Sequence, residues 1–152
     1  MQIALYQPDI PQNTGNVLRT AACLAVPVHI IEPAGFDSSD RALRRAGLDY
    51  LERAQLVRHP SFEAFDAWRL DACHRLIVLT TKARQRYTEF SFERGDLLLF
   101  GRESAGLPDH VHAGAEARLA IPMAAGLRSI NVAAACAMVL GEGLRQTNLF
   151  PR

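Results

Sequence analysis

The chain has 152 residues, of which 49% are hydrophobic, and its formal net charge is +1. This length corresponds to a single domain, and the hydrophobic fraction is high enough for a packed core, which excludes a disordered chain. No apolar run approaches the ~20 residues of a membrane helix, and the N-terminus lacks the pattern of a signal peptide. We therefore expect one cytoplasmic domain over residues 1–152.

The kinds of charged and sulfur-containing residues narrow the function classes further. All basic residues except Lys82 are arginine, which suits phosphate and base edges, although a GC-rich gene would produce the same bias. Cys23, Cys73 and Cys136 are odd in number and widely spaced, and the histidines lack the spacing of metal ligands. We expect reduced, packed thiols and no metal site.

In the first half of the chain, short apolar runs alternate with segments of helical periodicity. The expected elements are a strand over 3–6, a helix over about 16–25, a strand over 28–31, a helix over 40–46, a strand over 54–58 and a helix from 62 onward. Asn13, Thr14 and Asn16 are possible caps of the first helix, Gly47 ends the second, and Ser61 caps the third.

The second half contains longer apolar runs. The expected elements are strands over 75–81, 96–100 and 118–121, a basic loop after the first of them, and a long Ala-rich helix over about 131–146. Continuous apolar runs are typical of strands that are covered on both faces. The pattern predicts an α/β fold with a mostly parallel sheet flanked by helices.

Three loops follow strands, at the edge where open α/β sheets bind ligands. Their sequences are NTGNVLRT (13–20), FGRESAGLP (100–108) and IPMAAGLRSIN (121–131). Gly101 and Gly106 have the Walker A separation, but Leu107 and Pro108 stand where that motif requires Lys and Ser or Thr. A GxGxxG fingerprint is also absent, which argues against a dinucleotide.

A glycine loop of this kind lets the backbone approach a ligand closely, as suits a neutral or zwitterionic nucleoside. Each feature alone also has a purely structural explanation. Gly101 and Gly106 can be turn formers, and Ser129 or Asn131 can be a helix cap.

Together and in this order, the three loops resemble the SPOUT superfamily of RNA methyltransferases. The likeness is greatest to its small tRNA wobble-nucleotide (cytidine/uridine-34) 2′-O-methyltransferases. It extends from Gln2 to about Gln146 and is carried by LYQPDIPQNTGNVLRT, HIIEPAGF, RALRRAGLDY, LTTKA, LLLFGRESAGLP and IPMAAGLRSINVAAACAMVLGE. The sequence departs from the commonest pattern at Arg102 and at 130–132, and Arg102 also occurs in relatives that methylate other anticodon-loop positions.

The resemblance implies a C-terminal trefoil knot, a homodimer with its cofactor sites beside the subunit interface, S-adenosylmethionine as cofactor and tRNA as substrate. Base rates alone would argue against a knot. The cofactor pocket implied by the resemblance consists of Leu79, Thr80, Thr81, Phe100, Gly101, Ile121, Met123, Ser129 and Asn131.

The catalytic candidates are Arg19, Asn13, Glu103 and Ser129. Arg19 matches the motif-one arginine of the family, but a guanidinium hardly deprotonates in proteins. We therefore interpret Arg19 as a donor that grips a phosphate and stabilises developing oxyanion charge, with Asn13 orienting the nucleotide or Arg19. Glu103 is either the proton acceptor or a residue that holds the loop through backbone N–H groups.

Two surfaces are expected to meet partners. The candidate tRNA-backbone surface, whose alternative is an ordinary charged face, consists of Arg41, Arg44, Arg45, Lys82, Arg84 and Arg86. The last helix is the candidate dimer interface, because Val132, Cys136, Val139 and Leu140 exceed what a small sheet need cover, although core packing explains part of them.

Three other functions stay open. The methylated ribose can lie elsewhere in the anticodon loop or in ribosomal RNA, or the chain can be a non-catalytic RNA-binding protein on the same fold. A dehydrogenase is the weakest alternative, because the glycine fingerprint is missing.

Overall fold

A parallel seven-stranded sheet forms the centre of the protein, in a computed structural model that describes residues 1–45 and 53–152. The strand order is β3-β2-β1-β6-β4-β7-β5, and every neighbouring pair is parallel. The strands are β1 (Gln2–Tyr6), β2 (Val28–Ile31), β3 (Leu56–His59), β4 (Leu76–Leu79), β5 (Gln85–Arg86), β6 (Leu97–Phe100) and β7 (Ala117–Ala120). The carboxyl ends of all these strands therefore lie at one edge of the sheet.

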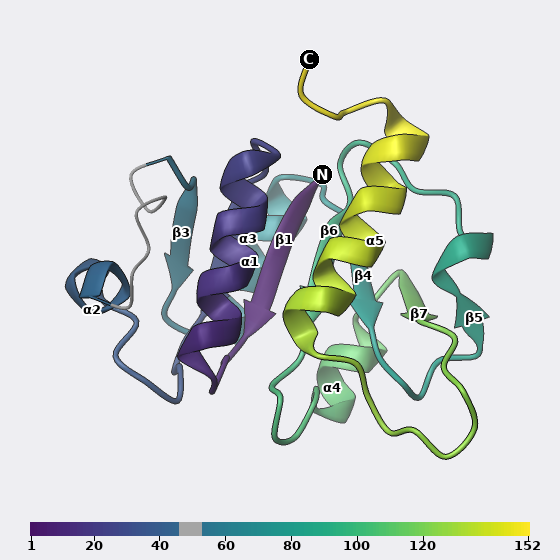
Figure 1. The fold of residues 1–152 in the computed structure, drawn as a ribbon, viewed down its shortest axis with the longest axis horizontal. Helices are drawn as coiled ribbons and strands as arrows, with labels where there is room; N and C mark the ends of the chain where they lie inside the picture. Colours follow the sequence, from purple (N-terminus) through teal and green to yellow (C-terminus); the bar gives the residue numbers. More distant parts are fainter. Residues whose placement is uncertain (46–52) are drawn as a thin grey trace.

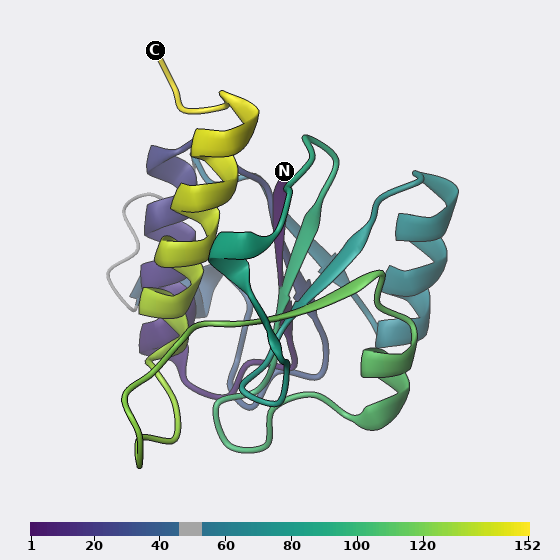
Figure 2. The same cartoon turned by 90° about the vertical axis from the view of Figure 1, so that its right-hand side faces the viewer.

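Helices cover both faces of the sheet, as Figures 1 and 2 show. One face carries α1 (Pro11–Cys23) and α5 (Val132–Thr147), which contact each other, and the other carries α3 (Phe62–Asp71) and α4 (Asp109–Ala113). The short α2 (Asp40–Arg45) lies beyond β3, and the 3-10 turn η1 (Tyr87–Glu89) follows β5.

The core consists of two layers, because successive side chains of a strand point to opposite faces. Ile3 and Leu5 of β1 pack toward α1 and α5, whereas Ala4 and Tyr6 pack toward α3 and α4. Both sets are buried, which explains why the central strands β1, β6 and β4 are largely apolar.

The apolar side of α5 belongs mostly to this core. Cys136, Val139 and Leu140 are fully buried, and Val132 is half-buried against the same cluster. The three buried side chains are therefore not available to a partner subunit, so assigning them to a dimer interface is wrong.

The start of α1 differs from the prediction. The helix begins at Pro11 rather than near Asn16, because proline suits the first helical position, where no N–H is needed and φ is already fixed. The cap position is Ile10, which makes no side-chain cap bond. Asn13, Thr14 and Asn16 therefore lie inside the helix, and none of them caps it.

The remaining elements agree with the prediction to within a few residues. The caps at Ser61 and Asn131 are confirmed, since their side chains accept backbone N–H groups of the following turn. The expected end of the second helix, at Ala46 and Gly47, lies outside the described residues. The two-residue β5, within the expected basic loop, and the five-residue α4 were both missed, because periodicity needs longer segments.

A chain of hydrogen bonds, buried at His29 and exposed at Gly95, runs beneath α3. His29 Nδ1 lies 2.9 Å from His59 Nε2, His29 Nε2 lies 2.6 Å from Gln2 Oε1, and Gln2 Nε2 lies 3.0 Å from His74 Nε2. His74 Nδ1 ends the chain at the Gly95 carbonyl oxygen, 2.9 Å away. Because that carbonyl only accepts, His74 Nδ1 donates to it, Gln2 Nε2 donates to His74 Nε2, and His29 Nε2 donates to Gln2 Oε1.

Acid should destabilise the fold through His29. Burial, together with the nearby His59 and His74, lowers the pKa of His29 from 6.5 to about 4. As the pH falls through 6.5, the unfolded chain takes up the proton first, so stability is lost between pH 6.5 and pH 4. The linkage predicts a loss of about 2 kcal/mol in the free energy of unfolding between pH 8 and pH 5.

Urea denaturation at the two pH values checks this. A His29→Gln variant should lose less stability than the wild type by about that amount, since glutamine does not titrate. The exposed His110 is the matched control, and a His110→Gln variant should keep the wild-type pH dependence. Equal pH dependence in His29→Gln and wild type would contradict the assignment.

Candidate functional site

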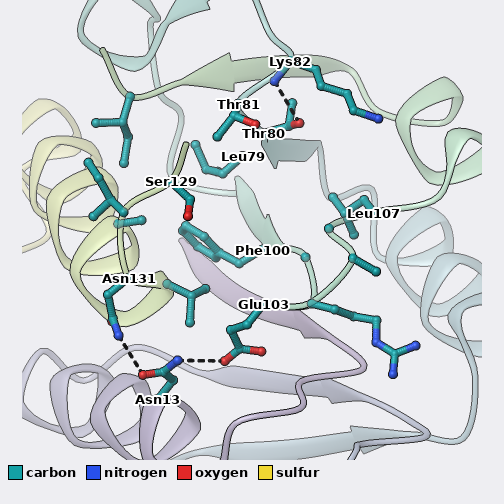
Figure 3. A pocket seen from close by; sticks show the side chains of 18 of the residues that line it. Asn13, Leu79, Thr80, Thr81, Lys82, Phe100, Glu103, Leu107, Ser129 and Asn131 are labelled. Atoms are coloured by element: carbon teal, nitrogen blue, oxygen red, sulfur yellow. Dashed lines mark hydrogen bonds between the residues drawn. The ribbon is translucent and has the colours of Figure 1, made fainter. Parts of the chain in front are cut away.

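A cavity of about 510 Å³ opens at the carboxyl edge of the sheet, above β1, β6, β4 and β7. This is the edge at which open α/β sheets bind ligands, and the volume is ordinary for a small-molecule site. Figure 3 shows the cavity from close by, with side chains converging from the loops after several strands.

All nine residues of the predicted cofactor pocket line this single cavity. They are Leu79, Thr80, Thr81, Phe100, Gly101, Ile121, Met123, Ser129 and Asn131. They come from three separate segments, which follow β4, β6 and β7. The structure therefore brings together what the sequence predicts, while the ligand they hold stays a prediction.

The chemistry of the walls is mostly neutral. Leu79, Phe100 and Ile121 supply apolar surface, and Thr80 and Ser129 supply hydroxyl groups. Such a mixture suits a flat heterocycle together with a sugar whose hydroxyls seek hydrogen bonds.

The loop after β6 is closed on itself by its glycines. Arg102 and Gly106 form an antiparallel bridge with N–H···O distances of 3.1 and 2.8 Å. A Cβ on Gly101 would lie 2.6 Å from the carbonyl carbon of Gly106, so only glycine fits there. Gly106 itself has a φ of +67°, in the left-handed region that favours glycine. The loop is thus a rigid wall of the cavity.

Asn13 joins three segments at the floor of the cavity. Its Oδ1 accepts a hydrogen bond of 2.8 Å from Asn131 Nδ2, and its Nδ2 donates one of 3.0 Å to Glu103 Oε1 (Figure 3). Asn131 Oδ1 in turn accepts from the first N–H groups of α5. The start of α5, the loop after β6 and α1 are thereby held in one arrangement.

Asp9 and Glu103 are joined by two hydrogen bonds, each from the backbone N–H of one residue to the side-chain carboxyl group of the other. The Asp9 N–H donates to Glu103 Oε2 at 3.2 Å, and the Glu103 N–H donates to Asp9 Oδ1 at 3.1 Å. Ser104 adds a backbone and a hydroxyl hydrogen bond to Asp9 Oδ2. Both oxygens of Glu103 are therefore engaged, which favours its role in holding the loop over that of a proton acceptor.

The same contacts shift the pKa values of the two carboxyl groups in opposite directions. Burial and the neighbouring Asp9 raise the pKa of Glu103, although its bond from Asn13 acts in the opposite direction. Hydrogen bonding to Glu103 and Ser104 lowers the pKa of Asp9 to about 2. Of the two carboxyl groups, Asp9 is therefore the stronger acid.

Arg19 is not part of the cavity of its own chain. It lies on α1 six residues after Asn13, which rotates it by about 240° around the helix axis, and its side chain is exposed. Asn13, by contrast, is buried and lines the cavity. Of the four catalytic candidates, the structure brings together Asn13, Glu103 and Ser129.

The predicted RNA-binding residues do not form one surface within a single chain. Arg41 is exposed on α2, beyond the β3 edge of the sheet, whereas Lys82, Arg84 and Arg86 are exposed near β5 at the opposite edge (Figure 1). The backbone of Arg44 and Arg45 belongs to α2, but their side chains lie outside what the structure describes. Lys82 also lines the cavity.

Several lining residues were not predicted. Ile10 lies three residues before Asn13, just outside the first motif segment. That short distance along the chain could have indicated that it lines the cavity. His112 comes from α4, which gave no periodic signal at all.

The cysteines differ in their exposure. Cys136 is buried, and burial raises its pKa to about 12, but the free thiols of Cys23 and Cys73 are exposed, so the expectation of packed thiols is wrong for these two. Over 1–45 and 53–152 we find no cluster of three or more His, Cys, Asp or Glu side chains that could hold a metal ion. None of the helices in these ranges is long and apolar enough to cross a membrane.

Comparison with known proteins gives three concordant similarities. Residues 1–141 match the SpoU rRNA Methylase family. A tRNA (cytidine(34)-2′-O)-methyltransferase from Beijerinckia indica is 60% identical over 150 residues, which are 99% of this chain and 94% of that relative. A solved structure concerned with the 2-OH methylation of C/U34 on tRNA has a TM-score of 0.88 at 45% identity and covers 95% of this chain and 94% of its own.

A further structural neighbour contains a cofactor. The SpoU methyltransferase AviRb from Streptomyces viridochromogenes, solved in complex with AdoMet, has a TM-score of 0.82 at 26% identity. The match covers 96% of this chain and 60% of that one. These neighbours confirm the predicted α/β fold class, and the trefoil knot is a property that the likeness implies.

Two glycine substitutions should separate steric from conformational constraint in the loop after β6. In Gly101→Ala the new methyl group meets backbone of Gly106, so the loop must shift, and we expect a loss of about 1–3 kcal/mol. In Gly106→Ala the methyl group meets open space, and only the positive φ costs about 1 kcal/mol. Urea denaturation measures both, and equal losses would contradict the close approach as the stronger constraint.

Proposed function

Because the chain belongs to the SpoU methylase family, we propose that it is an S-adenosylmethionine-dependent tRNA (cytidine(34)-2′-O)-methyltransferase. It transfers a methyl group to the ribose 2′-hydroxyl of the wobble nucleotide. The observation that carries this proposal is that all nine residues of the cofactor pocket implied by the resemblance line one cavity, in a chain 60% identical to an enzyme of that name. The tRNA substrate accords with a cytoplasmic location.

The cavity fits the cofactor. Its apolar walls at Leu79, Phe100 and Ile121 suit an adenine ring, and Thr80 and Ser129 offer hydroxyls to a ribose or an amino-acid end. The neutral character of these walls suits a zwitterion, whose own charges largely cancel. A neighbour of the same fold binds this cofactor.

The cofactor supplies a methyl group that is already activated on a positively charged sulfur. The remaining work of this chain is positional, and holding two reactants in line can supply several kcal/mol of the barrier. The bridged loop at 101–106 and the Asn131–Asn13–Glu103 hydrogen bonds fix the walls before any ligand arrives.

The 2′-hydroxyl must lose its proton as it attacks, and solvent water takes up that proton. Both oxygens of Glu103 already accept hydrogen bonds from the chain, so we assign it to holding the loop. We assign Arg19 to the RNA, as a donor that grips a phosphate and stabilises the developing oxyanion. Since Arg19 lies outside its own cavity, it would serve the cavity of a partner subunit.

A homodimer packed through α1 and α5 would permit this. The outward side of α5 presents Ala134, Ala137 and Met138, which are exposed, and Gly141, where a Cβ would meet open space. Their spacing of three and four residues makes one apolar stripe, whose small side chains allow close packing. Arg19 projects from α1, which lies beside α5 on the same face of the sheet.

The proposed activity is tested with labelled S-adenosylmethionine and an anticodon stem-loop. We expect label on an RNA with cytidine at the wobble position and none when that residue is 2′-deoxycytidine, because the attacking oxygen is missing. The matched control carries its deoxy residue at a neighbouring loop position and should be labelled normally. Label that persists on the wobble-deoxy RNA would indicate another ribose, and absence of cofactor binding would indicate a non-catalytic protein.

The action of Arg19 across the interface is tested by mixing two inactive variants. One is Arg19→Ala, and the other is Gly101→Val, which cannot form the cofactor cavity. Random exchange makes half of the dimers mixed, each with one intact site, so about a quarter of the wild-type activity should return.

The control is each variant mixed with itself, which should stay inactive. No recovery after subunit exchange, with mixed dimers shown to form, would contradict action in trans. A monomer that stays monomeric at high concentration in sedimentation would contradict the dimer itself.

A further inference from the structure

A second cavity, of about 600 Å³, lies at the β5 edge of the sheet, next to the cofactor cavity. It is bounded by the segment 80–85, by Phe90, by α4 and by the start of β7. Thr80, Lys82 and His112 line both cavities, so the two are contiguous. A polymer with one residue at the first cavity would have neighbouring residues at the second.

Three cations face this cavity, and none of them makes an ion pair within 1–45 and 53–152. They are Lys82 and Arg84, on the loop after β4, and Arg118, on β7, all with exposed side chains. Arg86, by contrast, lies 3.7 Å from Glu89 and outside the cavity. A group of cations without carboxylate partners attracts a polyanion.

The carboxylates of the cavity compensate little of this charge. Both oxygens of Glu116 are engaged, because its Oε1 accepts from Arg69 Nη1 at 2.9 Å and its Oε2 accepts from the Leu76 N–H at 2.6 Å. The buried Arg69, which Glu116 shares with Asp66, offsets part of its charge. Asp109, in the first turn of α4, is the other acid of the lining, so positive charge predominates.

Phe90 gives the cavity an aromatic wall. Its ring is half-buried and packs against Phe92, with 5.0 Å between the two ring centroids. The Arg75 guanidinium lies over the Phe90 ring, 5.5 Å from the centroid of that ring. A fixed ring beside unpaired cations is the combination that proteins use to hold single-stranded nucleic acid, with bases on aromatic groups and phosphates on cations.

We propose that this second cavity binds the RNA nucleotide that flanks the methylated one. Arg84 and Arg118 grip its phosphate, and Phe90 contacts its base or sugar. Lys82 lies where the two cavities meet and contacts the phosphate between the two nucleotides. The inference rests on the proposed RNA substrate and assigns one part of it to a defined place on the chain.

The test is an Arg84→Gln/Arg118→Gln variant, because these two side chains line only the second cavity. Anisotropy titrations with a labelled anticodon stem-loop, at several salt concentrations, measure binding. We expect weaker binding and a slope of log K against log salt that is smaller by about 0.7, because one phosphate contact is lost. Affinity for S-adenosylmethionine alone should equal that of the wild type.

The matched control removes the same charge elsewhere. Arg94 precedes β6 and Arg152 follows α5, at the end of the molecule where both termini lie in Figure 1, opposite to the cavities. An Arg94→Gln/Arg152→Gln variant should keep the wild-type slope. Arg84→Lys/Arg118→Lys should also keep it, because lysine still pairs with phosphate as a point charge.

Other outcomes would contradict the inference, and each has a different cause. If the control loses as much slope as the Arg84/Arg118 variant, the effect is one of bulk charge. If cofactor affinity falls together with RNA affinity, the second cavity supports the first rather than the RNA. If the wild type binds S-adenosylmethionine but no RNA, the proposed function fails, whereas a methylating wild type with an unaffected Arg84/Arg118 variant removes only this inference.

Discussion

The cavity of this protein depends on the two-sided hydrogen bonding of one amide. The Asn13 oxygen accepts from Asn131, and its nitrogen donates to Glu103, so a single side chain joins segments that are ninety or more positions apart. An aspartate could only accept, and a leucine could do neither. Asn13 is in place because α1 begins at Pro11, two residues earlier, and so presents it on the side facing the cavity. Local helix chemistry thereby fixes a long-range arrangement.

The sequence was sufficient for the sheet and for the content of the pocket. Apolar runs such as 97–100 and 76–79 identify buried strands, and parallel strands bring the loops that follow them to one edge. Three motif segments were therefore expected to meet. Asn13 of the first, which lies in α1 rather than in a loop, lines one cavity together with the nine residues taken from the resemblance. Local sequence patterns predict the type of each element, and the parallel topology predicts that the loops meet.

The features that sequence could not provide are short, or are spatial relations between distant elements. β5 has two residues and α4 has five, too few for a periodic signal, yet His112 of α4 lines both cavities and Gln85 of β5 lines the second. The basic residues near Arg41 and near Arg84 were expected to act together, but strand order separates them across the sheet. Arg19 and Asn13 share a motif and a helix, but their rotation about the axis gives them different surroundings.

The walls of the cofactor cavity come from both ends of the polypeptide, since Asn13 belongs to the first helix and 121–135 to the last segment before and within α5. During synthesis the second wall leaves the ribosome last. A chain arrested at residue 120 would already possess all the strands of the sheet, but it would have neither Ser129 nor Asn131, one of the two partners of Asn13. The cavity is therefore complete only once the start of α5 has been synthesised. A ligand that binds this cavity would stabilise finished molecules over truncated ones.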